Sequence, residues 1–541
     1  MKKISLKIIV IIIASLSMVI GGCNKKFEKY PANPNLPNEN DNIPPDMILR
    51  KVLNDIHLGG GVSAGRSGNV PEQVFQLVSR MNQYTVGMRS PLYGGSNEYD
   101  WAHSASPYST IRDLNQMERQ AINAYGEANN PYLTMSKFVK AYFYIWFTQR
   151  VGDIPMSEAG LGLDTPTPKF DKQKDVYSQC LDLLEEVNEE FAQLQASSVT
   201  SVQGDIYFNG NLSHWQKATN ALLIRTLISL SKRADDTPEL RIKQRFAEAI
   251  GNPAKYPLFT SNNDNLAFEW VPVVNRPDIF WRGLYADQTV LGKPIVDVTT
   301  QKNDPRIFLF GTPAPDELNA GKTVDDFTAY VGAPSGTPQG ILGENSKIGD
   351  PDDGYYSYVN FVRYFGDRVD NYLEDKTIIG FAELCFNIAE GIERGWAAGN
   401  AADFYNQGIQ ASLDFFGITD GMTLEIAGAF GAPKGSVVVD LPAFLNHPDV
   451  VYQGGQTGIR QIIEQKYVAL WENGNWEPFY NYRRTGYPEF DYGQGTNNQG
   501  QIPVRWRYEP AEIQNNPNAS KAISEQFGSD NVFSDMWLTK D

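Results

Sequence analysis

Residues 130–153, NPYLTMSKFVKAYFYIWFTQRVGD, predict a long helix and decide the fold class. Asn is favoured just before a helix and Pro at its first position, so Asn130 and Pro131 mark a start. Gly152 predicts the end, and Pro155 cannot continue the helix. Between them, apolar side chains recur at helical spacing: Met135, Phe138, Val139, Tyr142, Ile145 and Trp146. We therefore expect a helix over 131–151 with one face packed in a core.

The same periodicity recurs along the chain. It predicts further helices over 173–195, 213–234, 376–397, 401–416 and 457–473. Helix, short turn and helix, with Tyr, Ala and Gly at packing positions, resemble tetratricopeptide repeats, but the period is not clean. The chain is therefore predicted to be mainly α, with degenerate tetratricopeptide-like helix pairs as a scaffold.

The middle of the chain, residues 251–375, has a different composition. It is rich in Pro, Gly, Asn and Asp, as in GTPAPDELNAGK and GDPDDGYYSY. Such segments on a helical scaffold are usually functional or poorly ordered, and the many aromatic residues favour order. We expect a loop-rich ligand lobe with few short strands.

The N-terminus has the features of a secretion signal. Lys2, Lys3 and Lys7 precede an apolar run of about 13 residues, too short to span a membrane. The sequence Ile20-Gly21-Gly22-Cys23 then resembles the lipobox of bacterial lipoproteins. We expect a signal peptide over 1–22 and a lipid on Cys23. An ordinary signal peptide or an uncleaved anchor are the alternatives.

The rest of the chain is expected to form a flexible tether over 23–45 and a single domain over 46–541. Within that domain, the helical scaffold would comprise 46–250 and 376–541. The tether is rich in Pro and Asn and cannot bury enough apolar surface to fold alone.

Charge and cysteine content limit the partners. The formal net charge is −17, which argues against nucleic acid and anionic lipid as partners. Membrane contact should come from the acyl group.

Cys180 and Cys385 each lie in an apolar helical pattern, which favours buried free thiols, although a disulfide between them stays open.

Enzyme signatures are missing from the sequence. The four histidines have no metal-ligand spacing, and neither an HExxH nor a GxSxG motif occurs. Four glutamates at 185, 186, 189 and 190 line one helix and predict a solvated face. We therefore expect no catalytic residue, no metal site and no cofactor. A glycoside hydrolase, whose two carboxylates need no motif, remains a less favoured alternative.

The acidic turn DPDDG at 350–354 leaves calcium binding open. Its spacing is not that of an EF-hand loop.

Six segments behind the lipobox resemble the SusD/RagB family of Bacteroidetes outer-membrane nutrient-binding lipoproteins, in its starch-binding, outer-membrane-associating branch. The segments are KAYFYIWFTQRVGDIPMSEA at 140–159, HWQKATNALLIRTLISLSKR at 214–233, NDPRIF at 303–308, FAELCFNIAEGIERG at 381–395, EQKYVALWENGNWEPFYNYRRTGYPEF at 464–490 and IPVRWRYEPAEIQNNPNAS at 502–520. Their order along the whole chain makes the resemblance specific. The middle region matches poorly.

The resemblance implies a lipid-anchored lipoprotein of the outer membrane that faces the cell exterior. Such a protein captures a nutrient, usually an oligo- or polysaccharide, and passes it to a SusC-like TonB-dependent transporter. The alternative is a lid that closes such a transporter for peptides or another oligomeric nutrient. The sequence names neither the glycan nor its linkage.

Two loops place aromatic residues beside hydrogen-bonding residues without helical periodicity. They are NQYTVGMRSPLYGGSNEYDWAH at 82–103, with Tyr84, Tyr93, Tyr99 and Trp101, and FEWVPVVNRPDIFWRGLY at 268–285, with Trp270, Trp281, Arg282 and Tyr285. Aromatic faces bury the apolar side of a sugar ring, and polar neighbours bond its hydroxyls. We expect these residues to bind the ligand, Trp101 first. The alternative is that they fix the loops to the scaffold.

Overall fold

The computed structural model describes residues 42–58, 77–88, 106–269, 289–346, 352–364, 375–428, 431–496 and 500–541. The chain divides into residues 1–44 and a second part, Pro45–Asp541, which holds every helix and strand described below.

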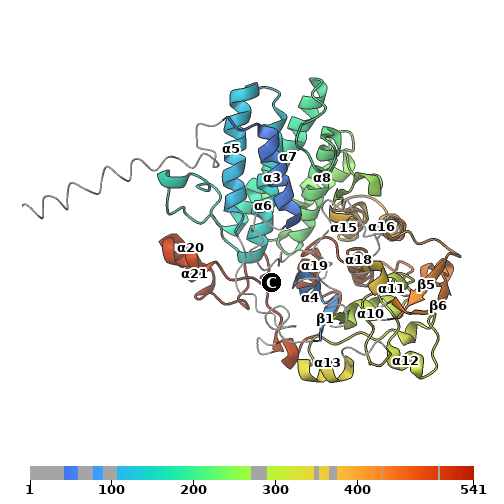
Figure 1. Ribbon diagram of the computed structural model, residues 1–541. Coiled ribbons are helices and arrows are strands. Elements are labelled where there is room, and N and C mark those ends of the chain that lie inside the picture. Colours follow the sequence, from blue (N-terminus) through green and yellow to red (C-terminus); the bar gives the residue numbers. More distant parts are fainter. Residues whose placement is uncertain are drawn as a thin grey trace, which may run out of the picture. The chain divides into compact units, whose positions relative to one another are not determined.

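The first half of the second part is a series of long helices, in which consecutive helices pack against one another (Figure 1). They are α3 (Pro45–Leu58), α5 (Tyr108–Tyr125), α6 (Pro131–Val151), α7 (Gln173–Ala196), α8 (Leu212–Ser229) and α9 (Ile242–Gly251). Helix α6 begins and ends as predicted: Asn130 Oδ1 accepts from Tyr132 N at 3.2 Å, and Gly152 N donates to Thr148 O at 3.0 Å. The helical interpretation of this half is confirmed. The sequence analysis did not predict α3, α5 or α9.

A second group of helices follows later in the chain. It comprises α15 (Phe381–Glu393), α16 (Ala401–Phe416), α18 (Gly455–Ala469) and α19 (Glu477–Thr485). Helix α15 packs on α16, α18 and α8, and so joins the two groups. We call both groups together the helical scaffold. The polar helix α19 was not predicted.

Four predicted helix boundaries were wrong: the helices expected to end at 397 and 473 end at Glu393 and Ala469, and two further boundaries differ as follows. The helix expected from 376 begins at Phe381, because Lys376–Ile379 forms strand β4, paired with β2 (Leu266–Phe268). The helix expected to end at 234 ends at Ser229 and continues as a short 3-10 turn, η2 (Ser231–Arg233).

The middle of the chain consists of short elements. Its described strands are β2 and β3 (Thr289–Leu291), in line with the prediction of few short strands. It also contains short helices that were not predicted: α10 (Lys293–Thr300), α11 (Ile307–Phe310), α12 (Pro315–Asn319), α13 (Gln339–Ser346) and α14 (Phe361–Tyr364), with turns η4 (Asn262–Asp264) and η7 (Phe327–Ala329).

The remaining elements are also short. They are α4 (Leu77–Met81), β1 (Thr85–Gly87), η1 (Gly162–Asp164), η3 (Pro238–Leu240), β5 (Thr423–Ala427), β6 (Pro433–Val438), α17 (Leu441–Leu445), η9 (Gln494–Thr496), α20 (Pro510–Asn515) and α21 (Pro517–Phe527). The named strands pair as three antiparallel two-stranded sheets, β1 with β3, β2 with β4, and β5 with β6.

Aromatic side chains fill the scaffold core. Trp215 is fully buried, its Nε1 donates to Asp205 Oδ2 at 2.9 Å, and Phe138 meets its ring edge-on. Trp146 is also buried and lies 3.7 Å from the guanidinium of Arg150. Both tryptophans therefore have structural roles.

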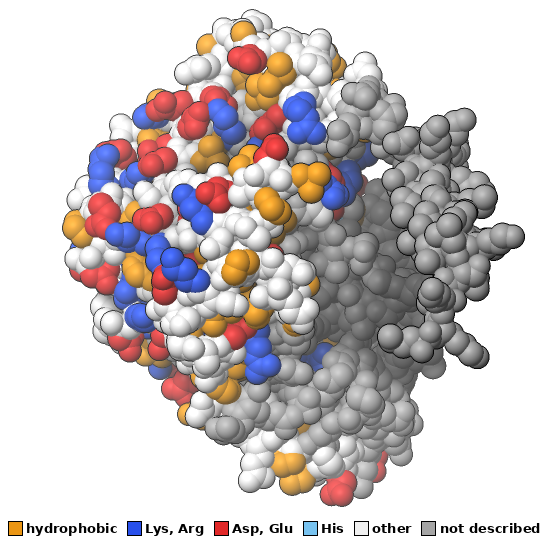
Figure 2. Space-filling model, turned by 90° about the vertical axis from the view of Figure 1, so that its left-hand side faces the viewer, with side chains coloured by type: hydrophobic (Ala, Val, Ile, Leu, Met, Phe, Trp, Pro, Cys, Tyr) orange, Lys and Arg blue, Asp and Glu red, His pale blue; other side chains and the backbone are white. Residues whose placement is uncertain are grey.

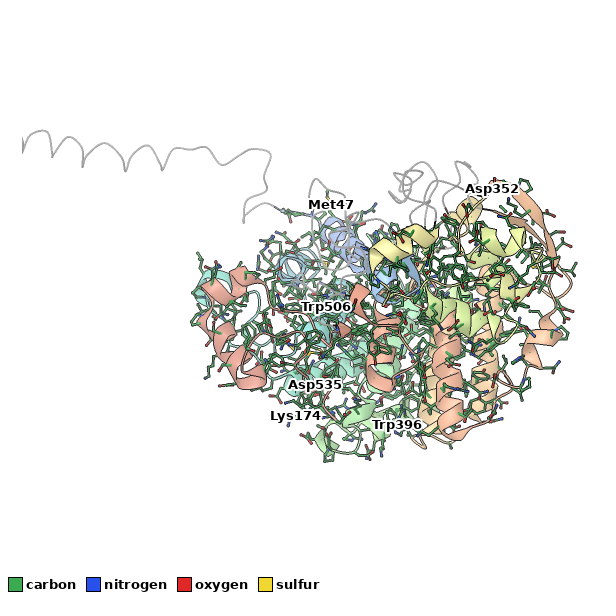
Figure 3. All side chains as sticks on the ribbon, turned by 90° about the horizontal axis from the view of Figure 1, so that it is seen from below. Met47, Lys174, Asp352, Trp396, Trp506 and Asp535 are labelled. Atoms are coloured by element: carbon green, nitrogen blue, oxygen red, sulfur yellow. The ribbon has the colours of Figure 1, made fainter. Side chains whose placement is uncertain are left out.

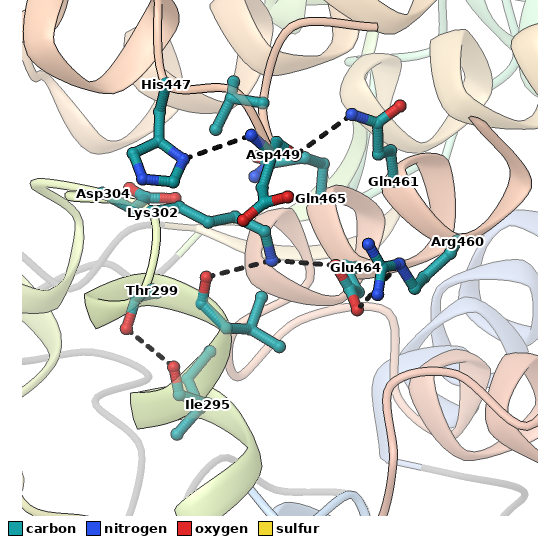
Figure 4. A network of polar contacts seen from close by, with 12 residues as sticks. Ile295, Thr299, Lys302, Asp304, His447, Asp449, Arg460, Gln461, Glu464 and Gln465 are labelled. Carbon is teal, nitrogen blue, oxygen red and sulfur yellow. Dashed lines mark hydrogen bonds and ion pairs between the residues drawn. The ribbon is translucent and has the colours of Figure 1, made fainter. Parts of the chain in front are cut away.

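Buried ion pairs fix the middle of the chain to the scaffold. Lys302, just after α10, donates to Glu464 of α18 at 2.8 Å (Figure 4). The guanidinium of the fully buried Arg306 pairs with Asp304 and donates to Ser412 Oγ of α16 at 2.8 Å. These contacts hold short elements in place that have little local propensity of their own.

The predicted surface and thiol features are confirmed. Glu185 pairs with Arg245, Glu189 with Lys255, and Glu186 with Lys137. Acidic and basic side chains are interspersed on the described face in Figure 2, without a large patch of one sign. Cys180 and Cys385 are buried and free. Burial raises the pKa of the Cys385 thiol to about 12.

Candidate ligand-binding site

Most residues predicted from the sequence to bind ligand lie outside the described residues. They are Tyr93, Tyr99, Trp101, Trp270, Trp281, Arg282 and Tyr285. The lipidation residue Cys23 also lies outside them. For all of these the sequence prediction stands as made.

Tyr84 is described, and it belongs to the core. It is fully buried, its hydroxyl donates to Tyr467 O at 2.6 Å, and its ring lies 4.5 Å from that of Tyr467 and 5.2 Å from that of Trp471. Burial raises the pKa of its phenol well above the usual value. No face remains for a ligand, so the prediction for Tyr84 was wrong.

One described border of each predicted loop lies at the ladder of β1 and β3. Strand β1 pairs with β3, and Gly87 lies opposite Thr289. Met88 is the last described residue before 89–105, and Thr289 is the first after 270–288. The residue that follows the second loop therefore lies next to the residues that precede the first loop.

Helix α13 borders the same place. A Cβ on Gly343 would lie 3.3 Å from Met88 O, and Tyr358 Oη donates to Ser346 O at 2.9 Å. A small apolar cluster lies beneath these contacts, separate from the main core, and consists of Val86, Met88, Val290, Ala333, Leu342, Tyr356 and Tyr358.

Two further loop borders lie at the second ladder, formed by β2 and β4. Phe268 of β2 lies opposite Lys376 of β4, close to the borders of 270–288 and 365–374. His57, at the end of α3, lies 3.6 Å from Phe268 between ring centroids, and its carbonyl accepts from Lys376 Nζ at 3.1 Å. We call the two ladders, α13 and residues 354–359 the loop platform.

His57 contributes no charge to the loop platform near neutral pH. Burial, with the nearby ammonium of Lys376, lowers the pKa of His57 to about 3. The imidazole is therefore neutral there and acts as a packing residue.

Two exposed tyrosines stand on or beside the loop platform, and the sequence analysis missed both. Tyr355 is 48% exposed, and its N donates to Asn345 O next to the end of α13. Tyr492 is 61% exposed, and the preceding residue, Asp491, accepts from Gly336 N at 2.5 Å. Both sit in Gly- and Asp-rich sequence, a signal that could have identified them. Exposed aromatic faces of this kind can stack on a sugar ring.

The described part of the acidic turn is engaged in an ion pair. Asp352 pairs with Lys434 at 2.8 Å and lies near the edge of the structure opposite Lys174 and Trp396 (Figure 3). Asp350 lies outside the described residues. Among the residues that are described, no group of three His, Cys, Asp or Glu side chains could hold a metal ion.

A groove on the scaffold is the main competing site. It has a volume of about 420 Å³ and lies among α5, α6 and α7, lined in part by Glu118, Leu133 and Glu190. Two of its three carboxylates are engaged, because Glu118 bonds Lys140 and Glu190 bonds Lys137. Its lining contains no aromatic residue, so the loop platform suits a sugar better.

The family model for starch-binding proteins that associate with the outer membrane matches residues 38–509. The chain belongs to this SusD-like family. The sequence resemblance is thereby confirmed over most of the chain. The family is one of nutrient-binding proteins, and its description places them at the outer membrane. A comparison with curated proteins gives no match.

Solved structures agree with the family assignment. A SusD homologue from Bacteroides fragilis is 27% identical, with a TM-score of 0.75 over 92% of this chain and all of its own. A second SusD homologue from the same species is 25% identical, with a TM-score of 0.72 and the same coverage. A chitin-binding SusD homologue from Flavobacterium johnsoniae is 18% identical, with a TM-score of 0.68 over 92% of this chain and 99% of its own, and shares the fold.

The described helices include none that is both long and apolar enough to cross a membrane.

Proposed function

We propose that this protein captures a glycan at the loop platform and delivers it to a SusC-like TonB-dependent transporter. The meeting of two loop borders at the β1–β3 ladder, on the same side of the loop platform as the exposed Tyr355 and Tyr492, supports the proposal. Tyrosine faces would bury the C–H side of a sugar ring. The loop aromatics predicted from the sequence, Trp101 foremost, would complete the surface.

Capture of a glycan on these tyrosine faces requires no covalent bond to be broken. His57 of α3, which packs against Phe268 of the second ladder, is buried and neutral, which suits packing rather than proton transfer. We therefore propose a binding protein without catalytic activity. Incubation with each bound glycan should release no new reducing ends, and steady release by the purified protein would favour the glycoside hydrolase alternative.

The first glycans to test are chitin oligosaccharides. Two structurally similar proteins are described as chitin-binding, although they are only 22% and 18% identical to this chain. Starch oligosaccharides come next because the family description names starch. Calorimetry of the purified mature protein against such a panel tests the proposal, with saturable binding of at least one glycan as the expected result.

A lid function for peptides or another oligomeric nutrient is the alternative. It predicts no measurable binding to any glycan of the panel, while the transporter still copurifies with the protein. Saturable glycan binding together with copurification would support capture and delivery.

The proposed location is the outer membrane, facing the cell exterior, with a lipid on Cys23 as the anchor. The small residues before Cys23 and the short apolar run support this. Mass spectrometry of the mature N-terminus should find an acylated Cys23, and Cys23→Ala should release the protein from membranes. An intact leader, or cleavage at another residue, would contradict this part of the proposal.

A further inference from the structure

A small cavity of about 20 Å³ lies where α8, α18 and α19 meet, and its Arg225 donates to the carbonyl of Ile378 in β4. Four of its lining residues are cationic and belong to these helices: Arg225, Lys466, Arg483 and Arg484. A fifth cation, Lys232 of η2, is paired with Asp541. One carboxylate, Glu477, lines it as well. The cavity has room for about one water-sized species.

Two of the four cations are neutralised by direct partners. Arg225 makes a two-point ion pair with Glu383, with Nε at 2.7 Å from Oε1. Arg484 makes a similar pair with Glu390, with Nη2 at 2.8 Å from Oε2, and Glu390 also pairs with Arg394. Burial alone would raise the pKa of Glu390, but the arginines beside it, Arg484 first, lower it to about 2. Both pairs are therefore ionised at neutral pH.

The other charges do not balance. Lys466 is 1% exposed and bonds only neutral oxygens, Asn387 Oδ1 at 2.7 Å and Asn481 Oδ1 at 3.1 Å. Arg483 bonds two backbone carbonyls, those of Gln149 and Val504. Against these two cations the lining offers only Glu477, which leaves an excess of at least one positive charge.

Hydrogen-bond donors are in excess too. Among the described residues, the third N–H of Lys466 has no partner, and neither has Nη1 of Arg225 or Nη2 of Arg483. Each of these side chains lines the cavity. Burial of an uncompensated charge is costly, so such a cluster favours an acceptor that carries negative charge.

We propose that the cavity binds one monovalent, monoatomic anion, a halide such as chloride, held by Lys466, Arg225 and Arg483. The volume excludes phosphate, sulfate and carboxylates, which need space for several heavy atoms. A halide accepts several N–H donors at once and supplies the missing negative charge. Burial raises the pKa of Glu477, which lessens its competition with the anion.

The competing resolution is that Lys466 loses its proton. Burial does lower the pKa of Lys466. A neutral Lys466 would remove the excess charge and leave only a water in the cavity. The two states differ in whether an anion is present, which can be observed directly.

Crystals of the wild-type protein grown or soaked in bromide provide the direct test. An anomalous bromide peak within hydrogen-bond distance of Lys466 and Arg483 is the expected result. Bromide found only at the surface, with none in this cavity, would overturn the proposal. The test needs no variant and so does not depend on a variant's folding.

Thermal unfolding provides the second test. At constant ionic strength, replacement of a bulky anion such as gluconate by chloride should raise the melting temperature saturably, by about 1–3 °C. Lys466→Met should abolish this difference. The matched control Lys174→Met removes an exposed lysine that pairs with Glu239 at the surface, and it should keep the difference. Equal loss in both variants, or none in either, would contradict the proposal.

Discussion

The helical scaffold and the loop platform are built on different length scales. Helices α6, α7 and α8 are 21, 24 and 18 residues long, and local capping residues begin α6 and α8. Strands β1 and β3 have three residues each, and β3 pairs with β1 and also bonds the distant Ser357, Tyr358 and Ala333. The long helices are determined by residues close together in sequence, whereas the loop platform is held together by contacts between residues far apart in sequence. We infer that changes at the platform alter binding, whereas changes in the scaffold alter stability.

The largest expected effect is a loss of stability in the helical scaffold. Glu383→Gln removes the charge that neutralises the buried Arg225, and loss of one partner of a buried pair costs about 3–5 kcal/mol of the free energy of unfolding. Urea denaturation measures the loss. The control Glu239→Gln, in an exposed pair, should produce no measurable change. Equal effects of both changes would show that the buried pair does not join α8 and α15 as described.

The next effect concerns the border of the scaffold and the platform at His57. Its pKa is lowered to about 3 in the folded state, whereas the unfolded chain takes up the proton near pH 6.5. Stability should therefore fall as the pH drops from 6.5, by about 2–3 kcal/mol at pH 4.5. His57→Gln should remove this fall, whereas His447→Gln should not. An unchanged pH profile of His57→Gln would mean that His57 is not buried as a neutral ring.

A platform effect is expected for Trp101. Trp101→Ala should weaken binding of the best glycan about tenfold, because stacking on one ring contributes about 1–2 kcal/mol. The melting temperature should stay within a few degrees. Calorimetry and thermal unfolding measure the two quantities. Unchanged affinity, or a variant that fails to fold, would assign Trp101 to the scaffold instead.

A slightly smaller effect is expected at the described tyrosines. Tyr355→Ala and Tyr492→Ala should each weaken glycan binding about three- to tenfold and leave stability nearly unchanged, because both rings are largely exposed. Tyr125 of α5 is 61% exposed on the scaffold and provides a matched control. Tyr125→Ala should leave the affinity unaltered. If it weakened binding and the platform variants did not, the scaffold groove would be the binding site.

The sequence could predict what local chemistry determines. Asn130 and Pro131 define the start of α6, and Asn400 defines that of α16, because each residue acts within one helical turn. Strand β4 was mistaken for helix because its pairing with β2 involves residues more than 100 positions away. The burial of Tyr84 likewise depends on Tyr467, 383 residues further along the chain.

The same limit applies to the candidate site. The sequence identified two aromatic loops, and the structure places one described border of each at the ladder of β1 and β3. It did not single out Tyr355 or Tyr492: their Gly- and Asp-rich surroundings indicate a turn, but the exposure of each ring depends on packing between distant segments. The buried charge excess around Lys466 was also invisible, because its members come from helices α8, α18 and α19.

The central claim is that a glycan binds at the loop platform. A crystal structure of the mature protein with the tightest-binding oligosaccharide of the panel tests it most directly. The account predicts sugar density against Tyr355 or Tyr492, beside the ladder of β1 and β3. Density in the groove among α5, α6 and α7, or no binding to any glycan, would contradict it.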